Sequence, residues 1–383
     1  MKYLKLSEII TIEKGKKNQV TDFPNEESVR LIQIDDLRAD NNIRFTNEKN
    51  GARVNEDDLL IVWDGANAGT VGYGKKGYIG STIAALKIYN KNFNTEFLGK
   101  YLQSKFNYLQ SNSTGATIPH VNRKFLEDIK IPIIQIEDQI RIANLLSRIE
   151  ELIAKRKESI RLLDEFVKSM FLEMFGDNNR NDFNYSTLDS LAEIVSGVTK
   201  GKSYNGQELI EIPYMRVANV KDGYIDLDAI KKINVTKSEV ELYELKYGDI
   251  LLTEGGDPDK LGRGAIWKEE IKLCIHQNHI FRVRITSDTI NSIYLCYLIG
   301  SSYGKKYFSK AAKQTTGIAS INSTQLKRFP VIIPPISMQN KLASLVGKVE
   351  LMKIKYNDNL FELEKLYGSV SQRAFREGYE HFN

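Results

Sequence analysis

A glycine-rich run from Gly72 to Gly77 is the first stretch that could carry chemistry, because it matches the GxGxxG spacing of dinucleotide-binding loops. In such loops the glycines open a helix, whose first amide groups hold the pyrophosphate. Here the run leads into residues 78–83, Tyr-Ile-Gly-Ser-Thr-Ile, which have a β-like composition. The spacing alone leaves a dinucleotide site open, but we expect a glycine-rich hairpin at this place.

A second pattern has the residue order of PD-ExK nucleases. Pro258 and Asp259 are followed, after ten residues, by Glu270, Ile271 and Lys272. That chemistry needs both acids and the lysine on adjacent strands around a divalent cation. The residues around Asp259 have instead the composition of an exposed turn, and the first half of the chain has no equivalent. We therefore expect no nuclease activity from this pattern.

Cys274, His276 and His279 form a third pattern, which has the residue types of a metal site. On a strand, Cys274 and His276 would share one face while His279 points to the other. A structural zinc site also needs four ligands, and the chain has no second cluster of this kind. We therefore expect packed or hydrogen-bonded histidines and no metal.

Two further catalytic motifs are missing from the chain. No nucleophile elbow is present, and no Asn/Asp-Pro-Pro-aromatic motif for methyl transfer to an amino group occurs. Pro334 and Pro335 are preceded by Ile333, which cannot supply the polar group that this transfer requires. We therefore expect a chain without catalytic residues of its own.

Lysines with aromatic neighbours form the pattern that favours binding over catalysis. Lys306, Lys310 and Lys313 recur at helical spacing, and Lys100 and Lys105 occupy the matching place in the first half. Lysines in a row neutralise phosphates without reading sequence, whereas a solvated helix face is the alternative interpretation. Loop residues that could meet base edges are Lys75, Lys76, Arg123, Arg216, Asn219 and Arg263.

The elements that must position these side chains occur twice, at a fixed spacing of 200 residues. From Gln139 to Met170, apolar residues recur at alternating steps of three and four, which is typical of a coiled-coil helix. One basic residue interrupts each copy, Arg156 in the first and Lys353 in the second. The predicted core positions are Ile142, Leu146, Ile149, Ile153, Ile160 and Leu163, and then Leu342, Val346, Val349, Tyr356, Leu360 and Leu363.

This period predicts a duplicated half, in which a long helix follows a globular domain. Strand and helix patterns are mixed without regular alternation, which favours an α+β fold in each domain. One of the expected helices runs from Phe97 to Gln110. We expect globular domains at residues 1–136 and 181–336, and long helices at residues 137–180 and 337–383.

The bulk composition narrows the class of protein only slightly. A net charge of +5 favours an anionic partner weakly. The chain has two cysteines, which fit a reducing compartment, and it lacks a run of about 18 apolar residues that could span a bilayer. The start of the chain also lacks the apolar stretch of a signal peptide, so we expect a cytoplasmic protein.

Several stretches resemble the specificity subunits of type I restriction-modification enzymes. Leu-Lys-Tyr-Gly-Asp-Ile-Leu at 245–251, together with residues 254–256, 261–264 and 276–284, resembles a target recognition domain. Pro334-Pro335-Ile336 with Gln339 is similar to the Pro-Pro-Leu-Glu-Glu-Gln signature at the start of the family's long helices. The first copy, Pro132 to Gln139, lacks the double proline.

The resemblance implies a non-catalytic subunit that binds double-stranded DNA. Each domain would read one half of a bipartite site, and two antiparallel helices would set the spacer. A helix over residues 139–170 would be about 48 Å long, which matches roughly 14 base pairs. Two methyltransferase subunits carrying S-adenosylmethionine would dock on it, and a restriction subunit using ATP and magnesium would join them. A nuclease or methyltransferase acting alone, or a protein-only coiled-coil scaffold, are the alternatives.

Overall fold

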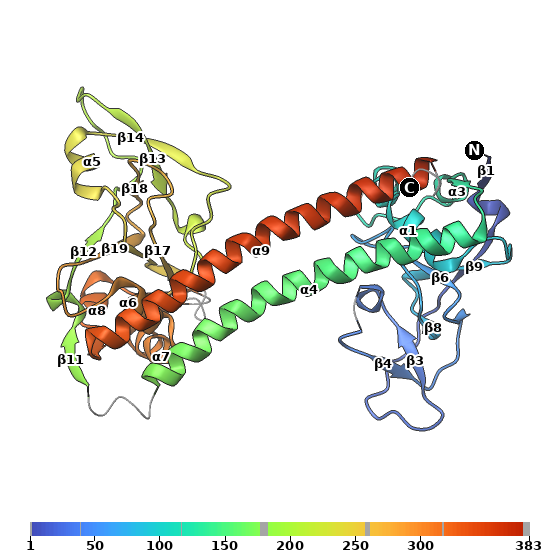
Figure 1. Cartoon of the computed structure of the whole chain (residues 1–383), viewed down its shortest axis with the longest axis horizontal. Coiled ribbons are helices and arrows are strands. Elements are labelled where there is room, and N and C mark those ends of the chain that lie inside the picture. The colour runs from blue at the N-terminus through green and yellow to red at the C-terminus, as the bar shows by residue number, and fades with distance from the viewer. Residues whose placement is uncertain are drawn as a thin grey trace. The chain divides into compact units, whose positions relative to one another are not determined.

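The structure is a computed structural model that describes residues 2–38, 40–115, 117–176, 183–256, 261–315 and 318–377. It separates into two compact units, which we describe one at a time. The first unit contains Met1–Glu158 and Asp358–Asn383, and the second contains Ser159–Asn357. Both long helices, α4 (Ile136–Phe175) and α9 (Ile336–Glu377), are therefore divided between the units (Figure 1).

The first unit is built on two four-stranded sheets, ordered β2-β9-β6-β7 and β4-β3-β8-β5, and a small β1-β10 sheet. Its strands are β1 (Tyr3–Lys5), β2 (Ile10–Lys14), β3 (Val29–Ile32), β4 (Arg44–Thr46), β5 (Arg53–Val54), β6 (Leu59–Val62), β7 (Val71–Gly72), β8 (Gly77–Ile79), β9 (Ile83–Ile88) and β10 (Lys130–Pro132). Its short helices are η1 (Leu6–Glu8), η2 (Asp35–Leu37), α1 (Thr95–Gln103), α2 (Phe106–Ser111) and α3 (Arg123–Glu127).

The second unit repeats most of this topology, without a described counterpart of β5 and with an additional three-stranded sheet. Its main sheets are ordered β12-β19-β15-β17 and β14-β13-β18, with smaller sheets β11-β22 and β16-β21-β20. Its strands are β11 (Asn184–Thr187), β12 (Ala192–Ser196), β13 (Ile210–Met215), β14 (Lys231–Val235), β15 (Ile250–Thr253), β16 (Gly255–Gly256), β17 (Gly264–Ile266), β18 (Ile275–His276), β19 (Ile280–Ile285), β20 (Lys313–Thr315), β21 (Ile318–Ser320) and β22 (Pro330–Ile333). Its short helices are η4 (Leu188–Ser190), η5 (Val217–Asn219), α5 (Lys237–Tyr243), α6 (Ser292–Gly300), α7 (Ser302–Ala311) and α8 (Ser323–Lys327).

The internal repeat extends from the helices to the pairing of the strands. β3 runs parallel to β8 in the first unit, and β13 runs parallel to β18 in the second, whereas the neighbouring pairs are antiparallel. The central strand β6, Leu-Leu-Ile-Val, is buried along its whole length, as is its counterpart β15. Continuous burial explains why β6 is apolar throughout, and why β15 is apolar up to Thr253 at its end, without alternation.

Each domain shares its core with its own portions of the two long helices. In the first unit, Phe375 of α9 packs edge-on against Phe97 and Tyr101 of α1, with ring centroids 5.8 and 5.0 Å apart. In the second unit, Phe171 and Phe175 of α4 pack against Tyr294 of α6, at 6.0 and 4.8 Å between centroids. Buried aromatic pairs contribute stabilisation beyond the area that they remove from water.

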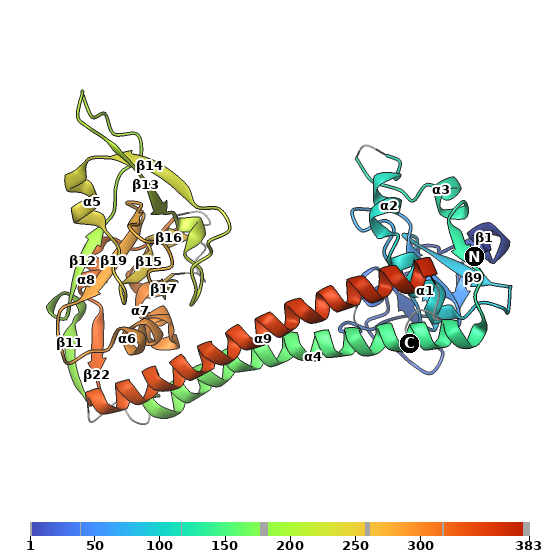
Figure 2. The ribbon, with the colours of Figure 1, turned by 45° about the horizontal axis from the view of Figure 1, so that its top comes forward.

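The two long helices are antiparallel in both units (Figure 2). In the first unit, Tyr367 donates a hydrogen bond to Glu150 at 2.7 Å, and Lys157 forms an ion pair with Glu364 at 2.8 Å. Residue numbers therefore rise along α4 in the direction in which they fall along α9. In the second unit, Lys353 binds Asp164 at 2.8 Å, while Leu342, earlier on α9, shares a core with the end of α4. The α+β fold with two antiparallel long helices, expected from the sequence, is confirmed.

Burial of the predicted coiled-coil core depends on whether a domain covers the helices. The positions nearest the start of each helix are buried, because a domain and the other helix both pack on them; these are Ile142, Leu146, Ile149, Leu342, Val346 and Val349. The later positions are half-buried, namely Ile153, Ile160, Leu163, Tyr356, Leu360 and Leu363. Lys353, the basic interruption in the second copy, is tolerated because Asp164 neutralises it.

Two local predictions were wrong. The helix expected from Phe97 to Gln110 is split into α1 and α2, and the hydroxyl of Ser104 donates to the carbonyl oxygen of Tyr101 where α1 ends. The run from Gly72 to Gly77 is not a hairpin, because β7 pairs with β6 whereas β8 pairs with β3 and β5. Gly77 passes so close to β3 that a Cβ there would lie 2.4 Å from the carbonyl oxygen of Arg30.

Within the described residues, no helix combines the length and the apolar character that crossing a membrane requires.

Candidate nucleic-acid interface

The lysine row predicted before residue 315 is divided between a helix and a strand. Lys306 and Lys310 lie one turn apart on α7 and are exposed. Lys313 belongs to β20, because α7 ends at Ala311, and its side chain lies outside the described residues. The prediction of one helical row was therefore wrong for Lys313, while Lys306 and Lys310 share a face that could meet phosphates.

The aromatic neighbours of these lysines belong to the core of the second unit. Phe308 is fully buried and stacks on Phe329, with ring centroids 5.2 Å apart. The hydroxyls of Tyr303 and Tyr307 donate to the carbonyl oxygens of Pro330 and Gln325 at 2.9 and 2.8 Å. These rings anchor α7, so the helix presents lysines outward while its aromatic face is committed to packing.

Lys100, in the matching position of the first unit, does not face solvent. The residue is only 2% exposed, and its ammonium forms an ion pair with Glu150 of α4. Burial lowers the pKa of Lys100, but the hydrogen bond to Glu150 and the interactions with Tyr73 and the charge of Glu150 outweigh this effect and raise the pKa overall, so the ammonium stays charged. Lys100 cannot reach a phosphate from this position, and its assignment to DNA binding was wrong. Lys105 is half-buried, with its ammonium 5.0 Å from the ring centroid of Tyr101.

The loop candidates of the first unit differ in whether their charged groups already form ion pairs within the chain. Lys75 forms an ion pair with Asp40 at 2.8 Å, and Arg123 binds Glu127 within α3 at 2.7 Å. Lys76 is exposed. Hydrogen bonds from Arg30 and Lys75 lower the pKa of Asp40 to about 2, so this carboxylate remains charged.

Asn219, a candidate for reading bases in the second unit, holds the fold together instead. It is 2% exposed, its Oδ1 accepts from the backbone N–H of Arg216 at 3.1 Å, and its Nδ2 donates to the backbone carbonyl oxygen of Asp226 at 2.9 Å. In the first unit, buried Asp36 accepts in the same way from the backbone N–H of Gln33. Both residues cap a short turn after equivalent strands, so the prediction that Asn219 meets a base was wrong.

The two arginine candidates of the second unit are half-buried. Nη2 of Arg216 donates to the carbonyl oxygen of Ala229 at 2.7 Å. The Nε atoms of both Arg216 and Arg263 are buried, and no hydrogen-bond partner for either is present in the described part of the chain. Because such groups are rarely left unpaired, each of these two Nε atoms could still donate to an acceptor, as could the buried Nε of Arg282.

A polar hollow in the first unit was missed by the sequence analysis. It has a volume of about 500 Å³ and is lined by Ile34, Asp35, Arg38, Asn41, Asn42 and Asn67. Residues after β3 and the loop between β6 and β7 form it, and Nη2 of Arg38 donates to Oδ1 of Asn67 at 2.6 Å. Amide, guanidinium and carboxylate groups are those that pair with base edges. The polar run at residues 35–42 was the available signal.

The histidines of the metal pattern have other partners in the fold. His276 is buried between the carbonyl oxygens of Tyr243 and Val195, at 3.1 and 3.2 Å, and burial lowers its pKa to about 4. His279 instead binds Glu254 at 2.7 Å on the surface. No group of three or more His, Cys, Asp or Glu side chains is placed to hold a metal ion within the described ranges. Asp259 of the nuclease pattern lies outside the described residues.

Comparison with known proteins identifies the class. The family described as "Type I restriction modification DNA specificity domain" matches residues 1–162 and 180–361. The chain therefore belongs to this family of type I restriction-modification specificity proteins. The two matched segments each contain one domain and most of the long helix that follows it.

Curated relatives carry the same description. The chain is 29% identical to the type I restriction enzyme MjaVIII specificity subunit of Methanocaldococcus jannaschii, covering 94% of this chain and 87% of the relative. It is 22% identical to the StySPI specificity subunit of Salmonella potsdam, over 97% and 87% of the two chains. It is 21% identical to the EcoKI specificity subunit of Escherichia coli, with the same coverage.

Solved structures agree at the level of the fold. The type I restriction-modification S subunit from M. genitalium aligns with a TM-score of 0.58 at 15% identity, covering 98% of this chain and 96% of that one. A chain from a study of complex assembly and conformational transition of the type I R-M system gives 0.60 at 15% identity, covering 99% and 98%. The resemblance seen in the sequence is confirmed, and the nuclease, methyltransferase and scaffold alternatives gain no support.

Proposed function

We propose that this chain is the non-catalytic subunit that reads DNA for a type I restriction-modification complex. Each domain would bind one half of a bipartite duplex site, and the helices would hold the two halves apart. The observation that carries the proposal is the duplication of the whole unit, including strand order and helix attachment. A duplicated reader suits a site with two separate halves.

The lengths of the helices support a spacer of more than one turn of DNA. α4 has 40 residues and α9 has 42, so each is about 60 Å long at about 1.5 Å per residue. A turn of B-DNA is about 34 Å. The bases between the two half-sites would then lie beside the helices and remain unread.

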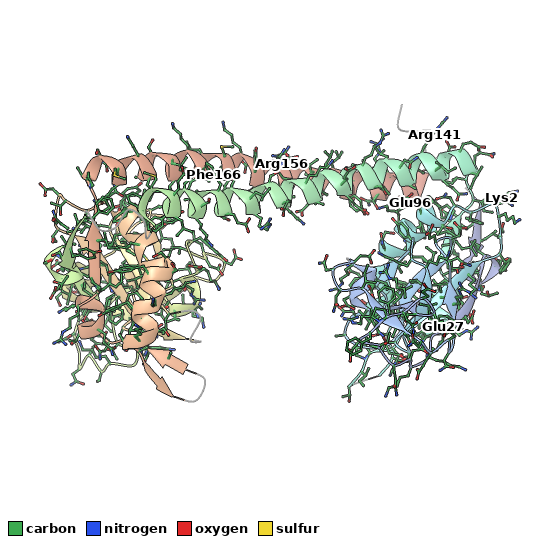
Figure 3. The ribbon with its side chains drawn as sticks, turned by 90° about the horizontal axis from the view of Figure 1, so that it is seen from below. Lys2, Glu27, Glu96, Arg141, Arg156 and Phe166 are labelled. Atoms are coloured by element: carbon green, nitrogen blue, oxygen red, sulfur yellow. The ribbon has the colours of Figure 1, made fainter. Side chains whose placement is uncertain are left out.

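Exposed apolar residues on the helices support docking of two copies of one partner. In the first unit, Leu152 and Leu366 are 52% and 46% exposed beside the hydrogen bond from Tyr367 to Glu150. The second unit repeats the pair as Met352 and Phe166, 42% and 46% exposed beside Lys353 and Asp164. Figure 3 labels Phe166 on α4. Exposed apolar groups at equivalent places favour identical partners on both units.

In our proposal, the partner subunits carry out the catalysis that this chain does not perform. Two methyltransferase subunits would carry S-adenosylmethionine and methylate one adenine in each half-site after flipping it out of the duplex. A restriction subunit that uses ATP and magnesium would join them for cleavage. The specificity subunit would hold no cofactor and would act by binding and orientation alone.

Selection from random DNA duplexes with the full-length chain tests the proposal. We expect two conserved blocks separated by a gap of fixed length and indifferent sequence. One contiguous block would contradict the two-reader arrangement. Absence of any selected sequence would favour a protein-only scaffold, and cleavage by the isolated chain in the presence of magnesium would favour a nuclease.

A further inference from the structure

A glutamate on α4 connects the first domain to both long helices. Glu150 accepts a hydrogen bond from the buried ammonium of Lys100, which belongs to α1 of the domain. Its other carboxylate oxygen accepts from the hydroxyl of Tyr367 on α9 at 2.7 Å. The Lys100 side chain is 1% exposed, whereas Glu150 is 43% exposed. One carboxylate therefore links a domain element to both helices in this unit.

The equivalent glutamate on α9 binds its domain directly and reaches the opposite helix through a lysine in the second unit. Glu350 lies 200 positions after Glu150. Its Oε2 accepts from the ammonium of Lys268, in the loop after β17, at 3.1 Å. Its Oε1 lies 3.5 Å from the ammonium of Lys353, which also binds Asp164 of α4 at 2.8 Å. Both glutamates therefore bind a lysine of their domain, but the link to the opposite helix is direct for Glu150 and passes through Lys353 for Glu350.

A second attachment lies near the start of each helix. Buried Gln139 accepts from the backbone N–H of Asn94 at 2.8 Å, just before α1. Buried Gln339 accepts from the backbone N–H of Asn291 at 2.8 Å, just before α6. In each unit the glutamine and the glutamate are 11 residues apart on one helix, or about 16 Å. Two attachments at this separation oppose rotation of the domain about either one.

The glutamate is the attachment that a single substitution can disturb most specifically. Charged hydrogen bonds are directional and stronger than neutral ones. Removing the charge of Glu150 would leave the ammonium of Lys100 buried without its counter-charge. The domain could then shift on its helices within the limits set by the apolar core that it shares with them.

We propose that Glu150 and Glu350 are positioning residues that orient each recognition domain on the helices and thereby restrict the length of spacer that the protein accepts. This inference rests on the proposed function, because a spacer exists only if the two domains read separate half-sites. Because one such glutamate serves each recognition domain, the pair would affect the distance accepted between the half-sites. The bases recognised in each half-site would stay unchanged.

Spacer selectivity of the full-length chain tests this inference. The probe is a set of duplexes carrying the sequence selected by the wild type, with the gap shortened or lengthened by one or two base pairs. We expect the wild type to prefer its own gap over a gap one base pair longer by about tenfold in dissociation constant. Glu150→Gln and Glu350→Gln should each reduce this preference to about threefold or less.

Two further variants make the result decisive. Glu151→Gln removes an exposed pair with Lys155 within α4 and should leave the preference intact. Tyr367→Phe removes one hydroxyl only and should reduce the preference for the wild-type gap partially. If Glu150→Gln fails to fold, this variant tests the inference in its place.

Equal weakening of binding at every gap length in Glu150→Gln, or an unchanged preference in all the glutamate and tyrosine variants, would overturn the inference while the bipartite site stood. A wild type that selects no bipartite site would instead overturn the proposed function, and this inference with it.

Discussion

His276 has a residue type associated with catalysis and metals, yet at the residue scale it serves the fold. Its ring nitrogens lie between two carbonyl oxygens, and burial lowers its pKa to about 4. A histidine in an unfolded chain titrates near 6.5. The unfolded state therefore binds more protons than the folded state between these two pH values. The contribution of His276 to stability is complete above about pH 6.5 and is lost as the pH falls towards 4.

A pH series of unfolding measurements tests this behaviour of His276. The wild type should lose roughly 2 kcal/mol of unfolding free energy between pH 7 and pH 5, relative to the same change in His276→Gln. Urea unfolding of the full-length chain at each pH provides the measurement. His279→Gln is the control for removing an imidazole, because His279 is exposed. Parallel profiles for the wild type and His276→Gln would show that His276 is not responsible.

Lys306 and Lys310 provide the residue-scale prediction for DNA binding. Each lysine that neutralises a phosphate contributes about 0.9 to the slope of log affinity against log salt. The double variant Lys306→Ala/Lys310→Ala should therefore bind all duplexes more weakly and reduce that slope by about two. Binding measured across a salt series gives the slope. The control is Lys155→Ala, an exposed lysine of α4 that pairs with Glu151; a slope as steep as that of the wild type would assign the two lysines to a solvated face.

Single residues were the part of the site that the sequence predicted least well. Lys100 and Asn219 have the residue types of nucleic-acid contacts, and both are 2% exposed. Lys100 is buried because Glu150, fifty positions away, provides its counter-charge. Asn219 is buried because Arg216 and Asp226 use its amide. Neither partner is visible in the local sequence, since burial of a polar group depends on what the fold brings to it.

At the scale of elements, the attachment of α4 depends on one buried side chain. Gln139 bonds with three backbone groups, the N–H of Asn94 and the carbonyl oxygens of Asn92 and Ile134. Gln339 repeats the arrangement with Asn291, Thr289 and Pro334. A glutamine amide both donates and accepts hydrogen bonds. It can therefore satisfy the N–H and carbonyl groups of a loop on which the start of a helix packs.

Gln139→Leu should reduce the unfolding free energy by about 3 kcal/mol, because it leaves an N–H and two carbonyl groups buried without partners. Urea unfolding followed by circular dichroism provides the measurement. Gln135→Leu is the matched control, since Gln135 is exposed four positions earlier and should change stability little. Equal effects of the two substitutions would exclude the hydrogen bonds of Gln139 as the cause.

The helices that could be predicted were those whose apolar residues recur at a regular period. The heptad pattern predicted both long helices, because apolar spacing on a helix reflects packing against a neighbour directly. The split between α1 and α2 was missed, because Leu98, Leu102 and Leu109 keep a helical spacing across Ser104. Strand order was also beyond the sequence, since the partners of β8 lie in β3 and β5 rather than in the adjacent β7.

At the scale of the whole molecule, the 200-residue repeat was the strongest signal in the sequence. It predicted the duplicated α+β domains and their long helices, and the family of known proteins agrees with it. The bases read by each domain could not be predicted, because loop side chains and DNA shape determine them jointly. The hollow that contains Arg38 and Asn67 illustrates this, since two loops distant in sequence form it.

Lengthening both long helices tests the central claim most directly. One heptad would be inserted into α4 and one into α9 near the boundary of the two units, and the DNA site would be selected again from random duplexes. Seven residues add about 10 Å to a helix, which is about three base pairs of B-DNA. We predict that the same two sequence blocks are selected with a gap about three base pairs longer. An unchanged gap, or one contiguous block, would contradict the claim that the paired helices set the distance between two reading domains.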